Sequence, residues 1–176
     1  MYKNGFSIIT VTNRDYCIEN MINNFLRQEF NDKELIIVIN NDKINIEDIY
    51  KYINKELNIF VYKLPEKTSL GACLNFGINK SNYNIISKFD DDDYYGPYYL
   101  DEANKAFLRE GCYVLGKQKT YYYLEQYKKL ILKRVAIENA YSQTLMGSTI
   151  CFKRKVFETD KDGNLIYREG IDKKGN

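Results

Sequence analysis

At residues 83–93 the chain reads YNIISKFDDDD, an apolar segment that stops at four consecutive aspartates. The β-branched and aromatic residues from Tyr83 to Phe89 predict a strand, and the aspartates place a loop at its carboxyl end. Pro97 follows shortly and suits the first turn of a helix, which we expect to continue to about Glu110. This stretch therefore predicts a strand, an acidic loop and a helix in succession.

The same succession occurs three times nearer the N-terminus. The predicted pairs are a strand at 6–11 with a helix from Asp15, a strand at 35–39 with a helix at 46–53, and a strand at 58–64 with a helix at 70–79. In the first helix, apolar residues recur with the i, i+3, i+4 and i+7 spacing of an amphipathic helix. Strands that alternate with helices in this way indicate an α/β protein with a mostly parallel sheet covered on both faces.

Polar residues follow three of the predicted strands: TNRD at 12–15, NND at 40–42 and DDDD at 90–93. The carboxyl ends of parallel strands share one edge of the sheet, and ligands bind in the crevice outside that edge. We therefore expect these three loops to line one crevice.

The pattern is looser after residue 111. It predicts strands at Cys112–Leu115 and Leu145–Phe152, and it leaves open the state of the aromatic, lysine-rich stretch that begins at Tyr121. Tyrosines in and before this stretch suit either sugar stacking or ordinary packing, and we favour packing. Without a repeat or a linker, residues 1–157 are expected to form one domain, followed by a polar tail at 158–176.

The composition excludes several classes of function. Twenty-six basic and 24 acidic residues give a net charge of only +2, and the basic residues are scattered, which argues against a nucleic-acid partner. The absence of histidine excludes an imidazole base and a histidine-rich zinc site. Four cysteines without CxxC spacing predict free thiols and a cytoplasmic protein. No apolar run approaches the roughly 18 residues of a membrane span, so none is expected.

The four aspartates at 90–93 have two interpretations. Adjacent carboxylates repel one another unless a cation is present, and Mg²⁺ or Mn²⁺ is commonly held by one or two carboxylates together with substrate phosphates. Alternatively, the acidic turn is solvated and caps the helix that follows, a role open to Asp93 in particular. The position after a strand of an alternating α/β chain favours the metal interpretation.

Six segments carry motifs that we consider together, in their order along the chain. They are Ser7–Thr10 with Asn13-Arg14, Arg27–Phe30, Glu34–Val38, Leu70–Ile78, Phe89–Asp93 with Pro97, and Gly147–Thr149 through Phe152-Lys153-Arg154. Together they resemble family 2 glycosyltransferases of the GT-A fold. The resemblance implies a three-layer α/β/α sandwich with a mostly parallel, Rossmann-like central sheet over residues 1–157.

The resemblance also implies a nucleotide-diphosphate-sugar donor, with UDP as the expected nucleotide. The residues expected to bind it are Thr10, Thr12, Arg14, Asn40, Asn41, Asp42, Lys67, Ser69, Asp90 and Asp91. Asp92, with Asp90, would hold Mn²⁺ or Mg²⁺. Lys67 and Ser69 are equally consistent with a solvated loop.

For the chemistry, the resemblance implies inverting transfer of the sugar to a glycan or cell-surface acceptor. Relatives carry an acidic motif beyond the last shared segment, and Asp172 in the tail is the stand-in for that base. The tail would then be a truncated acceptor region. The rival interpretation is a catalytically incomplete domain that binds nucleotide-sugar, or another subunit, without transfer. Peripheral membrane association and a homodimer are left open as partners.

Overall fold

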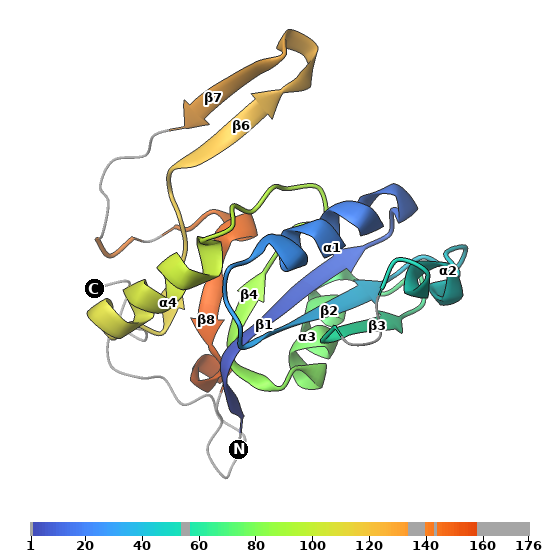
Figure 1. Cartoon of the computed structure of the whole chain (residues 1–176), viewed down its shortest axis with the longest axis horizontal. Coiled ribbons are helices and arrows are strands. Elements are labelled where there is room, and N and C mark those ends of the chain that lie inside the picture. Colours follow the sequence, from blue (N-terminus) through green and yellow to red (C-terminus); the bar gives the residue numbers. More distant parts are fainter. Residues whose placement is uncertain (1, 54–56, 134–139, 143, 158–176) are drawn as a thin grey trace.

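The computed structural model describes residues 2–53, 57–133, 140–142 and 144–157, which form a sheet flanked by helices and a separate hairpin (Figure 1). Its strands are β1 (Lys3–Thr12), β2 (Lys33–Ile39), β3 (Ile59–Lys63), β4 (Tyr83–Lys88), β5 (Val114–Leu115), β6 (Thr120–Leu124), β7 (Lys129–Lys133) and β8 (Cys151–Lys153). Its helices are α1 (Ile18–Arg27), α2 (Ile46–Tyr50), α3 (Leu70–Lys80) and α4 (Tyr99–Glu110), with short 3₁₀ turns at Asp15–Cys17, Glu125–Tyr127, Gly147–Thr149 and Arg154–Phe157.

The main sheet has the strand order β3-β2-β1-β4-β8-β5. β1 lies in the middle and pairs in parallel with both β2 and β4, while β8 pairs antiparallel with β4 and with β5. The sheet is therefore mostly parallel, as the alternating pattern predicts. The carboxyl ends of β1, β2 and β4 lie at one edge, where the polar loops follow.

Helices cover both faces of this sheet and give three layers. α1 and α4 bury their apolar stripes against one face, in a cluster that includes Phe6, Phe25, Leu100 and Phe107. α3 covers the other face, in a smaller cluster around Ile9, Ile36 and Cys73. Because both faces are covered, β2 is buried along almost its whole length.

Gly77 brings α3 close to the sheet. A Cβ atom at this position would lie 2.7 Å from Ile9 Cγ2 and 3.5 Å from Val38 Cγ2. The helix therefore packs on β1 and β2 at a distance that only a glycine permits. At the other end of the fold, Gly111 ends α4 in the left-handed conformation with a φ of 63°.

Three expectations from the sequence need correction. The strand expected at Leu145–Phe152 is only three residues long, because Gly147–Thr149 forms a 3₁₀ turn closed by the bond from Thr149 N to Met146 O. The helix expected from Pro97 begins at Tyr99, and the helix expected at 46–53 ends at Tyr50.

The stretch at Tyr121, which the sequence left open, forms the hairpin of β6 and β7. Among the described residues, no helix is long and apolar enough to cross a bilayer. The tail at 158–176 lies outside the described residues.

Candidate functional site

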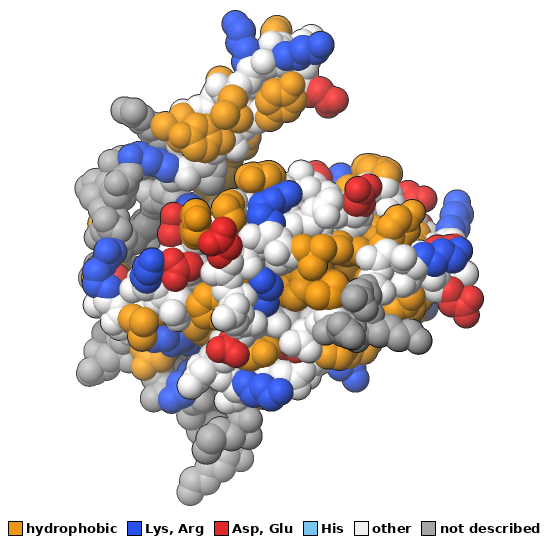
Figure 2. All heavy atoms as spheres, viewed as in Figure 1, with side chains coloured by type: hydrophobic (Ala, Val, Ile, Leu, Met, Phe, Trp, Pro, Cys, Tyr) orange, Lys and Arg blue, Asp and Glu red, His pale blue; other side chains and the backbone are white. Residues whose placement is uncertain are grey.

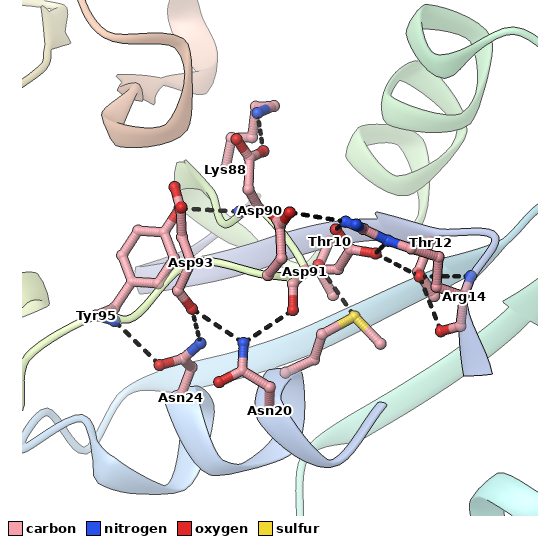
Figure 3. A network of polar contacts seen from close by, with 12 residues as sticks. Thr10, Thr12, Arg14, Asn20, Asn24, Lys88, Asp90, Asp91, Asp93 and Tyr95 are labelled. Carbon is pink, nitrogen blue, oxygen red and sulfur yellow. Dashed lines mark hydrogen bonds and ion pairs between the residues drawn. The ribbon is translucent and has the colours of Figure 1, made fainter. Parts of the chain in front are cut away.

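Asp91 is the anchor of the acidic loop after β4. Its carboxylate accepts hydrogen bonds from Thr12 Oγ1 at 2.5 Å and from Arg14 Nε at 3.1 Å, and it forms an ion pair with Arg14 Nη2 (Figure 3). Thr12 and Arg14 come from the end of β1, and Thr12 Oγ1 also accepts a bond from Arg14 N at 3.0 Å. The first strand end thus holds the acidic loop in place.

The charge of Asp91 is stabilised by these contacts. Burial alone would raise the pKa of Asp91, but the hydrogen bonds from Arg14 and Thr12 and the charge of Arg14 outweigh it and lower the pKa below the ordinary value. The same contacts raise the pKa of Arg14. Asp91 is therefore a carboxylate with its acceptor capacity already used inside the protein.

Asp90 and Asp92 are more exposed than Asp91. Their side chains are 36% and 58% exposed, against 10% for Asp91. Lys88 Nζ forms an ion pair with Asp90, and Arg14 Nη2 lies 3.1 Å from Asp92 Oδ2. Two carboxylates separated by one residue therefore reach the surface, each beside a basic side chain.

This donor set fits a hard divalent cation. Carboxylate oxygens are what Mg²⁺ and Mn²⁺ bind, and both ions commonly take only one or two of them when phosphates complete the coordination. Among the described residues, no cluster of three or more acidic or cysteine side chains is arranged to hold a metal. Asp90 and Asp92 therefore suit a metal that arrives with a diphosphate.

Asp93 differs from its neighbours, because burial raises its pKa and the charges of Asp90 and Asp92 add to the effect. A helix-capping role was open to Asp93 from the sequence. α4, however, begins after Tyr98 without any side-chain cap, so Asp93 does not have that role. Its main-chain oxygen instead accepts bonds from Asn20 Nδ2 at 3.0 Å and Asn24 Nδ2 at 2.8 Å.

A row of amides on α1 supports the whole loop. Asn20 also bonds to Asp91 O, Asn24 Oδ1 accepts from Tyr95 N at 3.0 Å, and Gln28 Nε2 donates to Gly96 O at 2.9 Å. Asn20 and Asn24 lie along one side of α1, and Gln28, the residue directly after α1, continues the same spacing of four. These amides were not predicted as site residues, although their spacing of i, i+4 and i+8 along an amphipathic helix and its end is a signal visible in the sequence.

Tyr95 links the acidic loop to the segment before β8. Its ring stacks on Phe89 with centroids 3.6 Å apart, and its hydroxyl accepts from Asp90 N at 2.8 Å while donating to Ser148 O at 2.6 Å. Burial raises the pKa of Tyr95, which keeps the hydroxyl protonated as a donor. Tyr95 thus packs inside the protein, which is the interpretation favoured from the sequence over sugar stacking.

Two hydrogen bonds, each donated by an asparagine side-chain amide, join the loops after β1, β2 and β3. Asn41 Nδ2 donates to Asn13 O at 2.8 Å, and Asn40 Nδ2 donates to Thr68 O at 3.3 Å. Asp42 is exposed in the same loop, and its main-chain oxygen accepts from Lys63 Nζ. The polar loops of the sheet edge therefore do meet, as the sequence predicts.

The remaining site residues vary in position. Ser69 caps the N-terminus of α3 through its bond from Ala72 N at 3.3 Å, and Lys67 is exposed just before it. Thr10 is buried and donates to Met21 Sδ at 3.2 Å, because it shares a face of β1 with Phe6 and Ile8 under α1. We therefore treat Thr10 as a packing residue rather than a ligand contact. Asp172 lies outside the described residues.

The model of glycosyl transferase family 2 matches residues 7–164 of the chain. This chain belongs to glycosyl transferase family 2. A curated relative, the O-antigen biosynthesis glycosyltransferase WbnJ of Escherichia coli, is 29% identical over 111 residues, which are 62% of this chain and 43% of WbnJ.

Solved structures of similar fold include residues 1–349 of TarS from S. aureus, with a TM-score of 0.62 and 21% identity over 86% of this chain and 48% of that one. The mannosyltransferase PcManGT from Pyrobaculum calidifontis, solved with GDP-Man and Mn²⁺, has a TM-score of 0.68 and 16% identity over 89% of this chain and 46% of that one. The three-layer sandwich is thus a GT-A fold. The chain spans less than half the length of each of these three proteins.

Proposed function

We propose that the chain is the donor-binding domain of a glycosyltransferase that uses a nucleotide-diphosphate sugar and a divalent metal. The observation that carries the proposal is the alternation at the end of β4, where Asp91 is held inward while Asp90 and Asp92 face outward. Membership of glycosyl transferase family 2 supports the reaction class.

The nucleoside would lie along the ends of β1 and β2. Asn40 and Asn41 have amide groups that hydrogen-bond a base edge, and Asp42 adds an exposed carboxylate beside them. Arg14 follows β1 and contacts Asp92, so it would lie between the nucleoside and the diphosphate. We propose UDP as the nucleotide, which TarS binds in its complex with UDP-GlcNAc, while PcManGT binds GDP-Man.

The metal would be held by Asp92 with Asp90, and we propose Mn²⁺ or Mg²⁺. When bound, such a cation neutralises the charge that develops on the leaving diphosphate. Asp91 contributes indirectly, because its bonds to Thr12 and Arg14 fix the backbone that carries both ligands. Lys88 neutralises Asp90 within the protein and would be released when the cation takes that carboxylate.

The acceptor and the stereochemistry rest on the family resemblance. We propose inverting transfer to a glycan or cell-surface acceptor, in which a carboxylate base takes the proton of the attacking hydroxyl. Among the described acidic residues of the loop, Asp91 is occupied by Arg14 and Thr12, and Asp90 and Asp92 are assigned to the metal. The base therefore belongs to another segment, for which Asp172 stays the candidate.

Calorimetry with UDP tests this function. UDP should bind in Mn²⁺ and lose most of its affinity in chelator, because the acidic loop repels a diphosphate when no cation bridges them. GDP in the same titration tests whether the site prefers uracil or guanine as the nucleobase. Equal UDP affinity in chelator and in Mn²⁺ would exclude the metal bridge. Release of UDP from a panel of UDP-sugars, with and without glycan acceptors, then separates a transferase from a domain that only binds the donor.

A further inference from the structure

The hairpin of β6 and β7 stands apart from the sandwich that carries the donor site (Figure 1). Every residue from Tyr121 to Lys133 is exposed, and within the described chain the two strands pair only with each other. Tyr122 Oη reaches Met146 Sδ at 3.8 Å beside the base of the hairpin. A two-stranded hairpin is only marginally stable in water by itself, so a second surface is needed to order it.

One face of the hairpin is made of tyrosine and leucine. Tyr121 lies opposite Leu132, and Tyr123 lies opposite Leu130, so these four side chains share a face, which we call the tyrosine–leucine face. Their exposed fractions are 68% and 62% for the tyrosines and 63% for Leu130, with Leu132 at 37%. Such a patch on a surface marks an interaction site with a protein or a membrane.

The hairpin also concentrates the positive charge of the chain. Residues 120–133, which form the hairpin, contain three lysines and one glutamate, whereas the other 162 residues contain 23 basic and 23 acidic residues. Lys128 and Lys129 lie at the turn and Lys133 at the opposite end. Figure 2 shows basic side chains at the tip of the hairpin and hydrophobic ones along its strands.

This combination favours a lipid surface over a protein. Lysine is depleted in protein interfaces, and a symmetric pair of hairpins would bring two strongly positive segments together. Tyrosine, in contrast, is enriched at the level of lipid headgroups, and lysines beside it attract anionic lipids. The other face combines Tyr122, Leu124 and Ile131 with Lys129 and Lys133 at its two ends, which also suits a segment lying in the headgroup layer.

We propose that the β6–β7 hairpin docks the domain onto an anionic lipid surface. The tyrosine–leucine face enters the headgroup layer, and the lysines at the turn and the base contact lipid phosphates. This inference concerns a surface outside the donor site and does not depend on the proposed transferase activity.

A single tryptophan tests which surface the hairpin meets. The chain contains no tryptophan, so Tyr123→Trp places one reporter on the tyrosine–leucine face. With phosphatidylcholine vesicles that contain phosphatidylglycerol, its emission should shift to the blue as the side chain leaves water. Tyr50→Trp on α2, 50% exposed in the wild type and at the far end of the sheet, is the matched control and should not shift (Figure 1).

Lysine variants test the charge requirement by co-sedimentation with the same vesicles. Lys128→Gln with Lys129→Gln should lower the lipid partition coefficient about thirtyfold, because each lysine near an anionic surface contributes roughly a factor of five. Lys43→Gln with Lys51→Gln removes the same charge from exposed positions outside the hairpin and should change partition far less.

Three results would overturn the proposal. They are failure of the wild-type chain to sediment with anionic vesicles, equal sedimentation with vesicles of phosphatidylcholine alone, and an equal loss in the two lysine pairs. A blue shift of Tyr123→Trp that grows with protein concentration in the absence of vesicles would instead assign the hairpin to contact between copies of this chain.

Discussion

At Arg14 a single guanidinium contacts two neighbouring aspartates, one buried and one exposed. Arg14→Met would leave Asp91 buried without its cation. We expect a loss of about 1–3 kcal/mol in unfolding free energy at neutral pH, less than for a fully buried pair because Arg14 is about one-third exposed. Urea unfolding measures this loss.

The sign of the pH dependence follows from Asp91. Its pKa is lowered in the folded protein, so its stabilisation is present above the ordinary aspartate value of about 3.9 and is lost as pH falls through the lowered value. The difference between wild type and Arg14→Met should therefore shrink at acidic pH. Arg109→Met, which removes the partner of Glu110 on the surface, serves as control. A constant difference across pH would refute the role given to Asp91.

Asp92 and Asp93 are adjacent, but we expect loss of charge to affect UDP binding at Asp92 and not at Asp93. Asp92→Asn should remove most of the metal dependence of UDP binding, because the exposed carboxylate is the proposed ligand. Asp93→Asn should leave UDP binding nearly unchanged. Since burial raises the pKa of Asp93, its ionised form is disfavoured by folding at neutral pH, and the amide should be neutral or slightly stabilising. Calorimetry and urea unfolding of both variants check this order, and a reversed order would move the metal site.

At the scale of elements, α1 supports the acidic loop through polar contacts as well as packing. Asn24→Ala would leave Tyr95 N without its partner inside the protein and would leave Asp93 O with Asn20 as its remaining donor. We expect a loss of about 1–3 kcal/mol in unfolding free energy, since one buried backbone donor is left unsatisfied, together with weaker UDP binding. Asn23 is exposed at the preceding position of the same helix. Asn23→Ala should change neither the free energy of unfolding nor that of UDP binding by more than about 0.5 kcal/mol. Similar losses in the two variants would contradict the role of the amide row.

The contact between α3 and the sheet gives a second test at this scale. Gly77→Ala places a methyl group 2.7 Å from Ile9 Cγ2, and the overpacking should exceed the gain in helix propensity, for a net loss of about 1 kcal/mol. Gly71→Ala lies in the same helix with nothing within 4 Å of the new Cβ, so it should stabilise by a few tenths of a kcal/mol. Thermal unfolding of both proteins should show shifts of opposite sign.

The elements also show which features a sequence reveals. The first four strands and their helices were predicted, because apolar periodicity and polar loops mark each unit directly. The order of β8 and β5 in the sheet was not predicted, since strands of two and three residues are too short to show an alternation of apolar and polar residues. At the site, the clustering of strand-end loops followed from topology. The bond from Tyr95 to Ser148, across 53 residues of sequence, leaves no local signal.

For the whole molecule, donor and metal should act as stabilisers of the fold. A ligand that binds only the folded chain adds about 2.7 kcal/mol at a hundredfold excess over its dissociation constant. For a chain of 176 residues this corresponds to a rise of roughly 5–10 °C in the midpoint of thermal unfolding. We expect the rise with UDP and Mn²⁺ together and not with UDP in chelator. A rise of equal size in chelator would show that the metal is dispensable for donor binding.

The strand order also determines when the sheet can be completed during synthesis. The four strands β3-β2-β1-β4 are all present once residue 88 has been made, but the neighbour of β4 on its other side, β8, begins only at Cys151. At roughly 5–20 residues per second, the ribosome needs several seconds to make the intervening segment. During that interval the free edge of β4 presents unpaired backbone groups to other nascent chains. The growing protein is therefore most vulnerable to mispairing between the emergence of its acidic loop and the arrival of β8.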